Sequence, residues 1–227
     1  HCLDRQSGEL IWKRPVSPGA SGALGLLEER LYVAEGPDVM ACLTTGGEEL
    51  WRRAIGATRW APDERGPLAL VATTDPAGLA ALDRDTGREL WRAELDEPPA
   101  TGPVVYKRTV LLGVGEGVQA RSLMDGKVVW SQTSGAPASE LVLSGTVLAY
   151  TSDAGEVVLL DPEKGELNGR AQDALAGKPP LLAGDLLIFA GDGRLLSRPL
   201  GTGEEPKSWM TTSWLGELTT PMIVHDD

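Results

Sequence analysis

The sequence predicts an all-β protein made of repeated four-stranded antiparallel sheets. An eleven-residue motif, ALDRDTGRELW in its best copy at 81–91, recurs along the whole chain. Its last position falls at residues 12, 51, 91, 130, 169 and 207, a spacing close to 39. Each period also contains short apolar runs between glycine-rich turns, which is typical of strands rather than helices. Repeats of about 40 residues with four strands each have the size of a propeller blade, so we expect a β-propeller.

The first periods show how the elements follow one another. The N-terminal segment predicts only two strands, joined by a turn at residues 6–8. The second period predicts four strands, at residues 23–28, 30–34, 39–43 and 49–51. The third predicts a strand at 67–74, a turn at 75–78 and a strand at 79–84. Glu64 and Arg65, which precede these strands, are expected to be solvated loop charges.

The later periods repeat this order with clear turn chemistry. In the fourth period the expected strands lie at 102–106, 109–115, 118–123 and 127–130. In the fifth they lie at 140–145, 147–152 and 156–161. In the sixth they lie at 179–184, 185–191 and 194–200, with a weak final strand near 207–209. The tail at 219–227 has the pattern of another first strand. Joined to the two N-terminal strands, it predicts a closing blade shared by both ends. We therefore expect six blades in a single domain of residues 1–227; the alternative is seven or eight blades with part of the chain absent.

The motif residues have structural tasks. One turn position is always glycine, and a positive φ is expected there; the residues are Gly8, Gly47, Gly87, Gly126, Gly165 and Gly203. Asp4, Asp83 and Asp161 can accept backbone N–H bonds within the same turn. A large flat apolar surface for the neighbouring blade is expected from Trp12, Trp51, Trp91 and Trp130.

The pattern Ala-x-Asp-x-x-Thr-Gly-x-x-x-Trp resembles the tryptophan-docking motif of the pyrroloquinoline quinone (PQQ)-like β-propellers. The copy that matches at every position has Ala81, Asp83, Thr86, Gly87 and Trp91. Other copies depart from it: Leu43 and Ser122 align with the Asp, and Gly169 and Lys207 align with the Trp. The resemblance covers nearly the whole chain. It implies the fold and no particular activity, because the motif residues dock blades.

Composition narrows the classes of partner. The net charge is −12 and the isoelectric point about 4.7, which argues against nucleic acid, because phosphate binding needs clustered Lys and Arg. No apolar run reaches the length of a membrane span, so direct membrane insertion is not expected. The chain starts at His1 without a signal peptide, so we expect a mature or excised piece of a longer product. The alignment places Cys2 and Cys42 on opposite strand faces, which predicts free thiols rather than a disulfide.

No chemical motif stands out. The quinoprotein members of the family have eight blades, a calcium-bound quinone and usually an adjacent-cysteine ring; this chain lacks a Cys-Cys pair. We therefore expect no enzyme, no catalytic residue and no cofactor. If the two ends meet, a metal-binding set by residue type would comprise His1, His225, Asp226 and Asp227. The simpler interpretation of these four residues is a polar turn.

Three tryptophans stand outside the docking positions: Trp60, Trp209 and Trp214. They are candidates for binding a partner, because exposed aromatic residues often anchor interfaces. The alternative for Trp209 and Trp214 is that they cover the weak sixth repeat.

The function that the sequence favours is a non-catalytic protein-binding or scaffolding module. Its partners would be other protein subunits or domains, bound through loops on the propeller faces. The resemblance implies a periplasmic, extracellular or cell-envelope setting in bacteria. Two alternatives remain: a ligand-sensing domain of a receptor or kinase, and a PQQ-dependent or other propeller enzyme.

Overall fold

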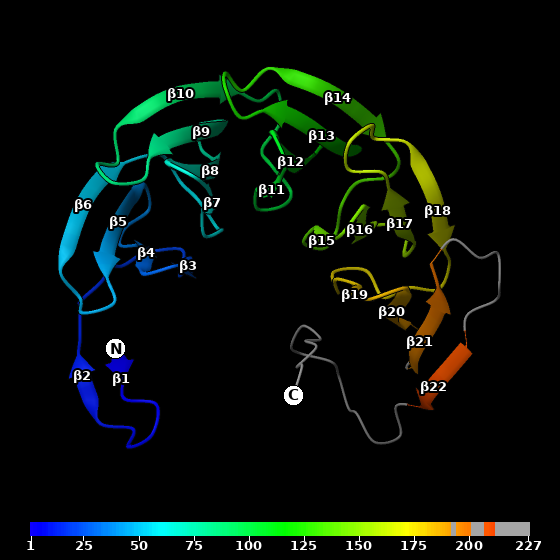
Figure 1. Ribbon diagram of the computed structural model, residues 1–227, viewed down its shortest axis with the longest axis horizontal. Coiled ribbons are helices and arrows are strands. Elements are labelled where there is room, and N and C mark those ends of the chain that lie inside the picture. The colour runs from blue at the N-terminus through cyan, green and yellow to red at the C-terminus, as the bar shows by residue number, and fades with distance from the viewer. Residues whose placement is uncertain (192–193, 201–206, 212–227) are drawn as a thin grey trace. The chain divides into compact units, whose positions relative to one another are not determined.

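Figure 1 presents the chain as a computed structural model that describes residues 1–191, 194–200 and 207–211. For residues 207–211 only the strand itself is described. The described residues form 22 β-strands, and they include no helix. Accordingly, none of their segments is a helix long and apolar enough to cross a membrane.

The strands pair in the order in which they follow along the chain (Figure 1). A two-stranded antiparallel sheet comes first, formed by β1 (Cys2–Leu3) and β2 (Leu10–Trp12). The next sheet contains β3 (Leu24–Leu27), β4 (Arg30–Ala34), β5 (Val39–Thr44) and β6 (Glu49–Ala54). It is followed by a sheet of β7 (Asp63–Arg65), β8 (Leu68–Thr74), β9 (Ala77–Asp83) and β10 (Glu89–Glu94).

Three further four-stranded sheets have the same order. One contains β11 (Val104–Tyr106), β12 (Thr109–Val114), β13 (Gly117–Ser122) and β14 (Val128–Thr133). Another contains β15 (Val142–Ser144), β16 (Val147–Thr151), β17 (Val157–Leu160) and β18 (Leu167–Ala171). The last contains β19 (Leu181–Ala183), β20 (Leu186–Gly191), β21 (Arg194–Pro199) and β22 (Lys207–Thr211). The predicted four-strand repeat is confirmed in these five sheets.

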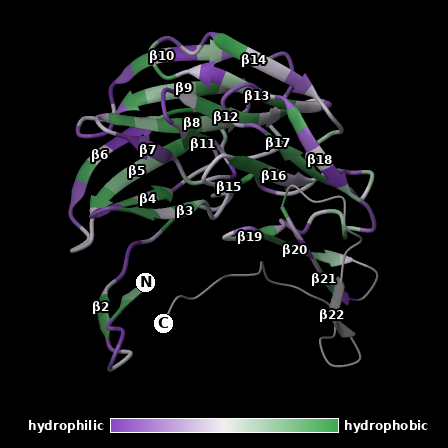
Figure 2. Ribbon diagram, turned by 45° about the vertical axis from the view of Figure 1, so that its right-hand side comes forward, coloured by the Kyte–Doolittle hydropathy of each residue, from purple (hydrophilic) through white to green (hydrophobic). Residues whose placement is uncertain are grey.

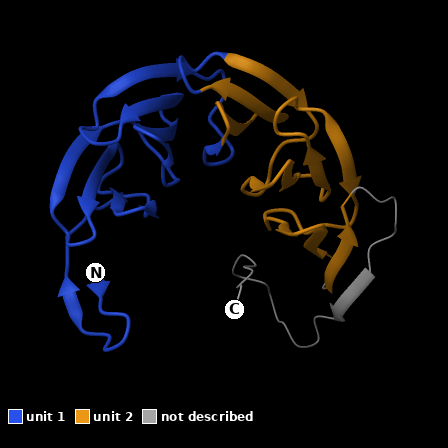
Figure 3. Cartoon of the chain, viewed as in Figure 1, with its two compact units in different colours: residues 1–105, 123–127 blue, residues 106–122, 128–227 orange. Residues whose placement is uncertain are grey.

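The chain divides into two compact units (Figure 3). One comprises residues 1–105 with 123–127, and the other comprises residues 106–122 with 128–227. The single domain of residues 1–227 stays a prediction. The N-terminal half of the predicted closing blade is present as β1 and β2, whereas its proposed C-terminal half lies outside the described residues.

Each unit has an apolar core between two of its sheets. In the first unit Tyr32, Met40 and Trp51 pack with Val71 and Leu82, so the cluster joins sheets β3–β6 and β7–β10. In the second unit a cluster that includes Leu159, Leu187 and Phe189 joins sheets β15–β18 and β19–β22. The hydrophobic residues concentrate in the middle strands, such as β8, β9 and β12 in Figure 2. Burial of these faces is the main favourable term for a sheet protein of this kind.

The third period contains a strand that the sequence pattern did not predict. Asp63–Arg65 forms β7 and pairs with β8, although the segment has no apolar residue. The predicted turn at 75–78 is also shorter, because Ala77 and Gly78 already pair with β8. Glu64, expected as a solvated loop charge, has a side chain that is only 7% exposed. That prediction was wrong, because a carboxylate with fixed partners can occupy a buried strand position.

The second repeat differs from the sequence alignment by one residue. Trp51 lies opposite Cys42, as Trp91 lies opposite Ala81 and Trp12 lies opposite Cys2. The two cysteines therefore occupy equivalent positions, and the predicted opposite faces were wrong. The prediction that both thiols are free is confirmed.

The cause of the shift is a shorter turn after β5. The Thr44 amide donates to the Glu48 carbonyl at 2.8 Å, and Thr44 Oγ1 accepts the Glu48 amide at 3.2 Å. Thr44, and not Leu43, therefore stands where other copies have Asp. Leu43 is instead fully buried and lies opposite Glu49.

The aspartates of the other copies accept the bonds expected of them. Asp83 Oδ1 accepts the Asp85 amide at 3.2 Å, the Thr86 amide at 2.9 Å and the Thr86 hydroxyl at 2.7 Å. Asp4 and Asp161 make the same turn, accepting the amides of Gln6, Ser7, Glu163 and Lys164. The bonds to Thr86 lower the pKa of Asp83, because they favour the ionised carboxylate.

Candidate functional site

Three of the predicted docking tryptophans donate a hydrogen bond to the turn of the next repeat. Trp12 Nε1 donates to the Thr45 carbonyl at 3.0 Å. Trp51 Nε1 donates to the Arg84 carbonyl at 2.8 Å, and Trp91 Nε1 donates to the Leu123 carbonyl at 3.0 Å. These contacts occur at sequence separations of 32 or 33 residues, so each joins one repeat to the next.

The glycine of the accepting turn lies directly under the indole ring. A Cβ added at Gly87 would lie 2.5 Å from the Trp51 ring. The same overlap would occur at Gly47 with Trp12, at Gly126 with Trp91 and at Gly165 with Trp130. The predicted positive φ is confirmed at Gly8, Gly47, Gly87, Gly126 and Gly165, whereas Gly203 lies outside the described residues. Glycine is thus required both for the backbone conformation and for the close approach.

Trp130 differs from the other three. Its ring lies on Gly165, where an added Cβ would be 2.5 Å away. Its Nε1 is nevertheless buried without a hydrogen-bond partner in the described part of the chain. An unpaired buried N–H costs free energy, so this contact is the weaker version of the same arrangement.

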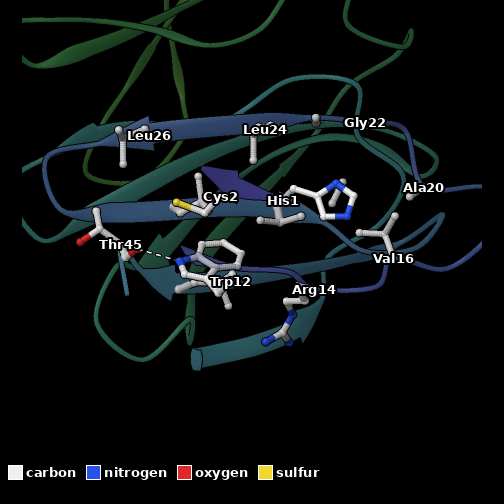
Figure 4. Close-up of a pocket in the computed structure, with 15 residues that line it drawn as sticks. His1, Cys2, Trp12, Arg14, Val16, Ala20, Gly22, Leu24, Leu26 and Thr45 are labelled. Atoms are coloured by element: carbon white, nitrogen blue, oxygen red, sulfur yellow. Dashed lines mark hydrogen bonds between the residues drawn. The ribbon is translucent and has the colours of Figure 1, made fainter. Parts of the chain in front are cut away.

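A pocket of about 590 Å³ lies within the first unit, between the two-stranded sheet and sheet β3–β6 (Figure 4). Cys2 of β1 and Trp12 of β2 line one side, and Leu24 and Leu26 of β3 line the other. The remaining lining is His1, Arg14, Val16, Ala20, Gly22, Ala23, Leu31, Val33, Ala34, Leu43 and Thr45. A concave, mostly apolar lining with few polar groups is typical of a binding site.

The side chain of Arg14, which lines the described part of the pocket, is already paired. Arg14 donates through Nε to Glu35 and through Nη2 to Glu49, and Arg52 Nη2 lies 2.7 Å from Glu35 Oε2. The hydrogen bond to Glu35 raises the pKa of Arg14, and the bond from Arg14 lowers the pKa of Glu49. Because its charge is compensated, Arg14 does not make the pocket a strong anion site.

Leu24 and Leu26 are unusually exposed for the first strand of a sheet. They are 63% and 62% exposed, whereas no residue of the corresponding strands β11, β15 and β19 is exposed. Their strand neighbours Gly25 and Leu27 point to the opposite face, where Gly25 meets Ala61 and Leu27 packs on the core. Among the described residues, the face toward the pocket borders the two-stranded sheet of β1 and β2, and Leu24 and Leu26 are accessible on it.

A polar cluster inside the first unit was missed by sequence reasoning. Tyr32 of β4 donates its hydroxyl to Glu64 of β7, and Arg84 Nη1 donates to Glu64 at 3.3 Å and to Glu28 at 3.0 Å. Burial raises the pKa of Tyr32 well above its ordinary value. It also raises the pKa of the neighbouring Cys42 thiol to about 11. No local pattern reveals these partners, because the residues that meet are 20 to 56 positions apart.

Trp60 lies against the backbone of a later loop. An added Cβ at Gly102 would be 3.1 Å from Trp60 Cβ, and the Trp60 amide bonds to Thr58 Oγ1 at 3.3 Å. Trp60 as a residue is half-buried, and a partner-binding role for it stays a hypothesis. Trp209 falls in β22, whose side chains are not described, and Trp214 lies outside the described residues.

The proposed metal-binding set cannot be assembled from the described chain. His1 lines the pocket, whereas His225, Asp226 and Asp227 lie outside the described residues. Among residues 1–191, 194–200 and 207–211 no three His, Cys, Asp or Glu side chains gather as metal ligands.

Comparisons with known proteins were made by sequence and by structure. The chain matches the family model of "Outer membrane protein assembly factor BamB" over residues 1–140 and 65–227, which together span its whole length. Among curated proteins there is no significant match.

Solved structures share the fold at low identity. The crystal structure of BamB from Moraxella catarrhalis is 18% identical, with a TM-score of 0.70 over 82% of this chain and 62% of that one. The computationally designed Ika8 protein is 17% identical, with a TM-score of 0.66 over 81% and 59%. The quinohemoprotein alcohol dehydrogenase from Comamonas testosteroni is 16% identical, with a TM-score of 0.69 over 85% and 43%. The chain thus spans about 62% of the length of the BamB that it matches.

The repeated four-stranded sheets, the tryptophan contacts between repeats and these likenesses agree on one fold, the PQQ-like β-propeller. Because the family model covers the whole chain, the protein belongs to the family of the outer membrane protein assembly factor BamB.

Proposed function

We propose that the chain is a non-catalytic, protein-binding scaffold in a bacterial envelope assembly, located in the periplasm or at the cell envelope. The observation that carries this proposal is the family match over the whole chain, since the family is described as an outer membrane protein assembly factor. A module of this kind contributes binding surface to a complex and performs no chemistry itself.

The surface supports a binding role. Apolar side chains on several strands are exposed, among them Ile11, Leu50, Leu90 and Val129, each directly before a docking tryptophan. Leu24 and Leu26 add a second apolar region inside the pocket. Protein interfaces have apolar centres with polar rims, and exposed apolar regions often mark them.

In-cell cross-linking of the chain in its native bacterium, followed by mass spectrometry, tests the proposal. We expect cross-links to other subunits of an outer membrane protein assembly complex. The Trp51→Ala variant is expected to give fewer of these cross-links, because loss of the buried ring should destabilise the contact between two repeats of the first unit. Quinone-like absorbance and dye reduction after addition of PQQ and Ca²⁺ would instead establish an enzyme and overturn the scaffold proposal.

A further inference from the structure

A second pocket of the first unit, of about 440 Å³, lies where two neighbouring sheets meet. Residues 53–55, at the end of β6, line one side, and Leu82 with residues 86–89, around the turn from β9 to β10, line the other. β6 and β10 are the last strands of their sheets (Figure 1). This hollow is called the arginine pocket, after Arg53 and Arg88 in its lining.

The charges of Arg53 and Arg88 are not taken up by an ion pair with any described residue. Arg53 donates to two backbone carbonyls, from Nη1 to Arg52 at 2.8 Å and from Nη2 to Thr86 at 2.9 Å. Arg88 contributes only the smallest of the causes that lower the pKa of Asp83. Both arginines are exposed, so their guanidinium groups can still meet an anion.

The carboxylate of Glu89, which also lines the arginine pocket, is compensated. Arg92 donates to it through Nε at 3.0 Å and through Nη2 at 2.8 Å. Arg92 is held in place by a further bond from Nη2 to the Ile55 carbonyl at 3.0 Å. The arginine pocket is therefore locally positive on a chain whose net charge is −12.

The docking of one repeat on the next does not explain why two arginines meet here. Arg53 stands two positions after a docking tryptophan, and Arg88 follows the turn glycine under that ring. The corresponding pairs at the other three described tryptophan–glycine contacts are Arg14 with Glu48, Ala93 with Lys127, and Gln132 with Glu166. Those contacts form without two cations, so the pair at 53 and 88 is free to serve another purpose.

The lining favours a carboxylate as the ligand. Guanidinium groups bind carboxylate and phosphate oxygens through paired, charge-assisted hydrogen bonds. Ala54, Ile55 and Leu82 make the rest of the lining partly apolar, which suits a carboxylate carried on a carbon chain better than a hydrated phosphate. A large anionic surface, such as a membrane, would also be repelled by the net charge of the whole chain, whereas a single carboxylate responds to the local field.

We propose that the arginine pocket binds a carboxylate group of another polypeptide, between Arg53 and Arg88 and with an apolar carbon chain against Ile55 and Leu82. The group is an Asp or Glu side chain or a C-terminal carboxylate. The choice of a carboxylate follows from the geometry, and its origin in a partner polypeptide rests on the proposed function.

A peptide titration of the full chain at low ionic strength tests the proposal. The probe is the acetylated and amidated peptide Gly-Leu-Glu-Leu-Gly, and binding is followed by the amide resonances of the nitrogen-15-labelled chain. We expect saturable shifts at residues 53–55 and 86–89. The same peptide with glutamine in place of glutamate should bind about tenfold or more weakly, because it loses the charge-assisted bonds. The glutamine peptide with a free C-terminus then shows whether a terminal carboxylate can replace the side chain.

Matched protein variants locate the site. Among the described residues Arg88 is hydrogen-bonded through its backbone, so Arg88→Gln should keep the fold and lower the affinity about tenfold, as should Arg53→Gln. Arg65→Gln makes the same change in net charge at an exposed position of β7 outside the arginine pocket and should leave affinity unchanged. Glu89→Gln should raise the affinity, because it removes a negative charge and releases Arg92; a merely destabilising change would not. Thermal melts followed by circular dichroism verify that all four variants are folded.

Other outcomes overturn the proposal in distinct ways. Absence of binding, or binding insensitive to both Arg53→Gln and Arg88→Gln, excludes the site. Displacement of the peptide by less inorganic phosphate than acetate assigns a phosphoryl group instead. Binding of phosphatidylglycerol vesicles that Arg88→Gln abolishes assigns a membrane surface.

The source of the carboxylate is tested separately. Peptide binding that appears only after Asp226→Asn combined with Asp227→Asn would show that the chain's own carboxylate occupies the arginine pocket, which overturns the partner assignment. If the peptide binds as expected but in-cell cross-links to assembly subunits are absent, the carboxylate site stands and the proposed scaffold function fails.

Discussion

At the scale of single residues, the four docking tryptophans differ in whether the indole N–H has a hydrogen-bond partner. Trp12, Trp51 and Trp91 donate to a carbonyl of the next repeat, whereas the buried Nε1 of Trp130 has no partner in the described part of the chain. A typical hydrogen bond contributes about 1 kcal/mol to stability, and an unpaired buried donor costs a similar amount or more. Trp130 should therefore respond to the same substitution differently from Trp12, Trp51 and Trp91.

Replacement of each tryptophan by phenylalanine tests this difference. Trp91→Phe keeps an aromatic ring and loses the bond to Leu123, so the free energy of unfolding should fall by about 1 kcal/mol. Trp130→Phe removes an unpaired donor and should have a smaller effect. Trp91→Ala, which also removes the ring, should cost roughly 3–5 kcal/mol. Urea unfolding measures all three, and equal effects at positions 91 and 130 would contradict the argument.

The glycines under the rings allow a second residue-scale prediction. Gly87 and Gly66 both have a positive φ, of 66° and 58°, but only Gly87 faces a ring, that of Trp51. An alanine costs about 1–2 kcal/mol for the left-handed conformation alone. We expect Gly66→Ala to show that cost and Gly87→Ala a clearly larger one, measured as the change in unfolding free energy. Similar values for the two variants would show that the ring contact does not matter.

At the scale of elements, the turn after β9 depends on an ionised carboxylate. Hydrogen bonds from Thr86 lower the pKa of Asp83 below its ordinary value of 3.8. Because the folded pKa is the lower one, ionisation of Asp83 stabilises the fold above pH 3.8, and this stability is lost as the pH falls through the folded pKa.

The Asp83→Asn variant isolates that contribution. It keeps an acceptor oxygen but loses the charge, so it should be less stable than the natural chain near neutral pH. The difference should shrink in acid as Asp83 becomes protonated. Unfolding midpoints across the pH range measure it, and a difference that grows in acid would contradict the assignment.

The interface between sheets β3–β6 and β7–β10 combines an apolar core with one buried polar pair. The Tyr32 hydroxyl donates a hydrogen bond to Glu64, and Arg84 Nη1 donates another to the same carboxylate. A double-mutant cycle of Tyr32→Phe and Glu64→Gln should give a coupling energy of about 0.5–3 kcal/mol, because each single change leaves the other group with a lost or weakened bond. Additive effects would show that the pair does not interact energetically.

At the scale of the whole molecule, the repeats make stability a sum of local contributions. Each sheet has its own strand pairing, and neighbouring repeats add a tryptophan contact, so loss of one contact should weaken the chain without unfolding all of it.

The Trp12→Ala variant tests the additivity of these local contributions at the N-terminal end of the chain. Trp12→Ala removes the contact of β2 with Gly47 and the bond to Thr45, but it leaves the core around Met40 and Val71 untouched. We expect a lower melting temperature with the β-sheet circular dichroism signal retained. Ile11→Ala, at an exposed neighbouring position, is the control and should change little. Complete loss of the β-sheet signal in Trp12→Ala would contradict additivity.

Much of the fold could be predicted because the motif repeats. The expected strand at 30–34 matches β4, and the turn glycines and aspartates adopt the predicted geometry. The strand at 63–65 could not be predicted, because Asp-Glu-Arg has no apolar alternation and its burial comes from Tyr32 and Arg84. The candidate site was not predicted either, since Leu24 and Leu26 appear in the sequence as ordinary core residues.

The sequence by itself determined the repeat, the order of the strands and the chemistry of the turns, because these depend on residues a few positions apart. The tertiary structure alone decided that Thr44 replaces the turn aspartate, that the two cysteines are equivalent and that Glu64 is buried. It also decided that Leu24 and Leu26 remain accessible beside the two-stranded sheet. These properties depend on which distant segments meet and on how many strands cover a face, and a local pattern does not contain that information.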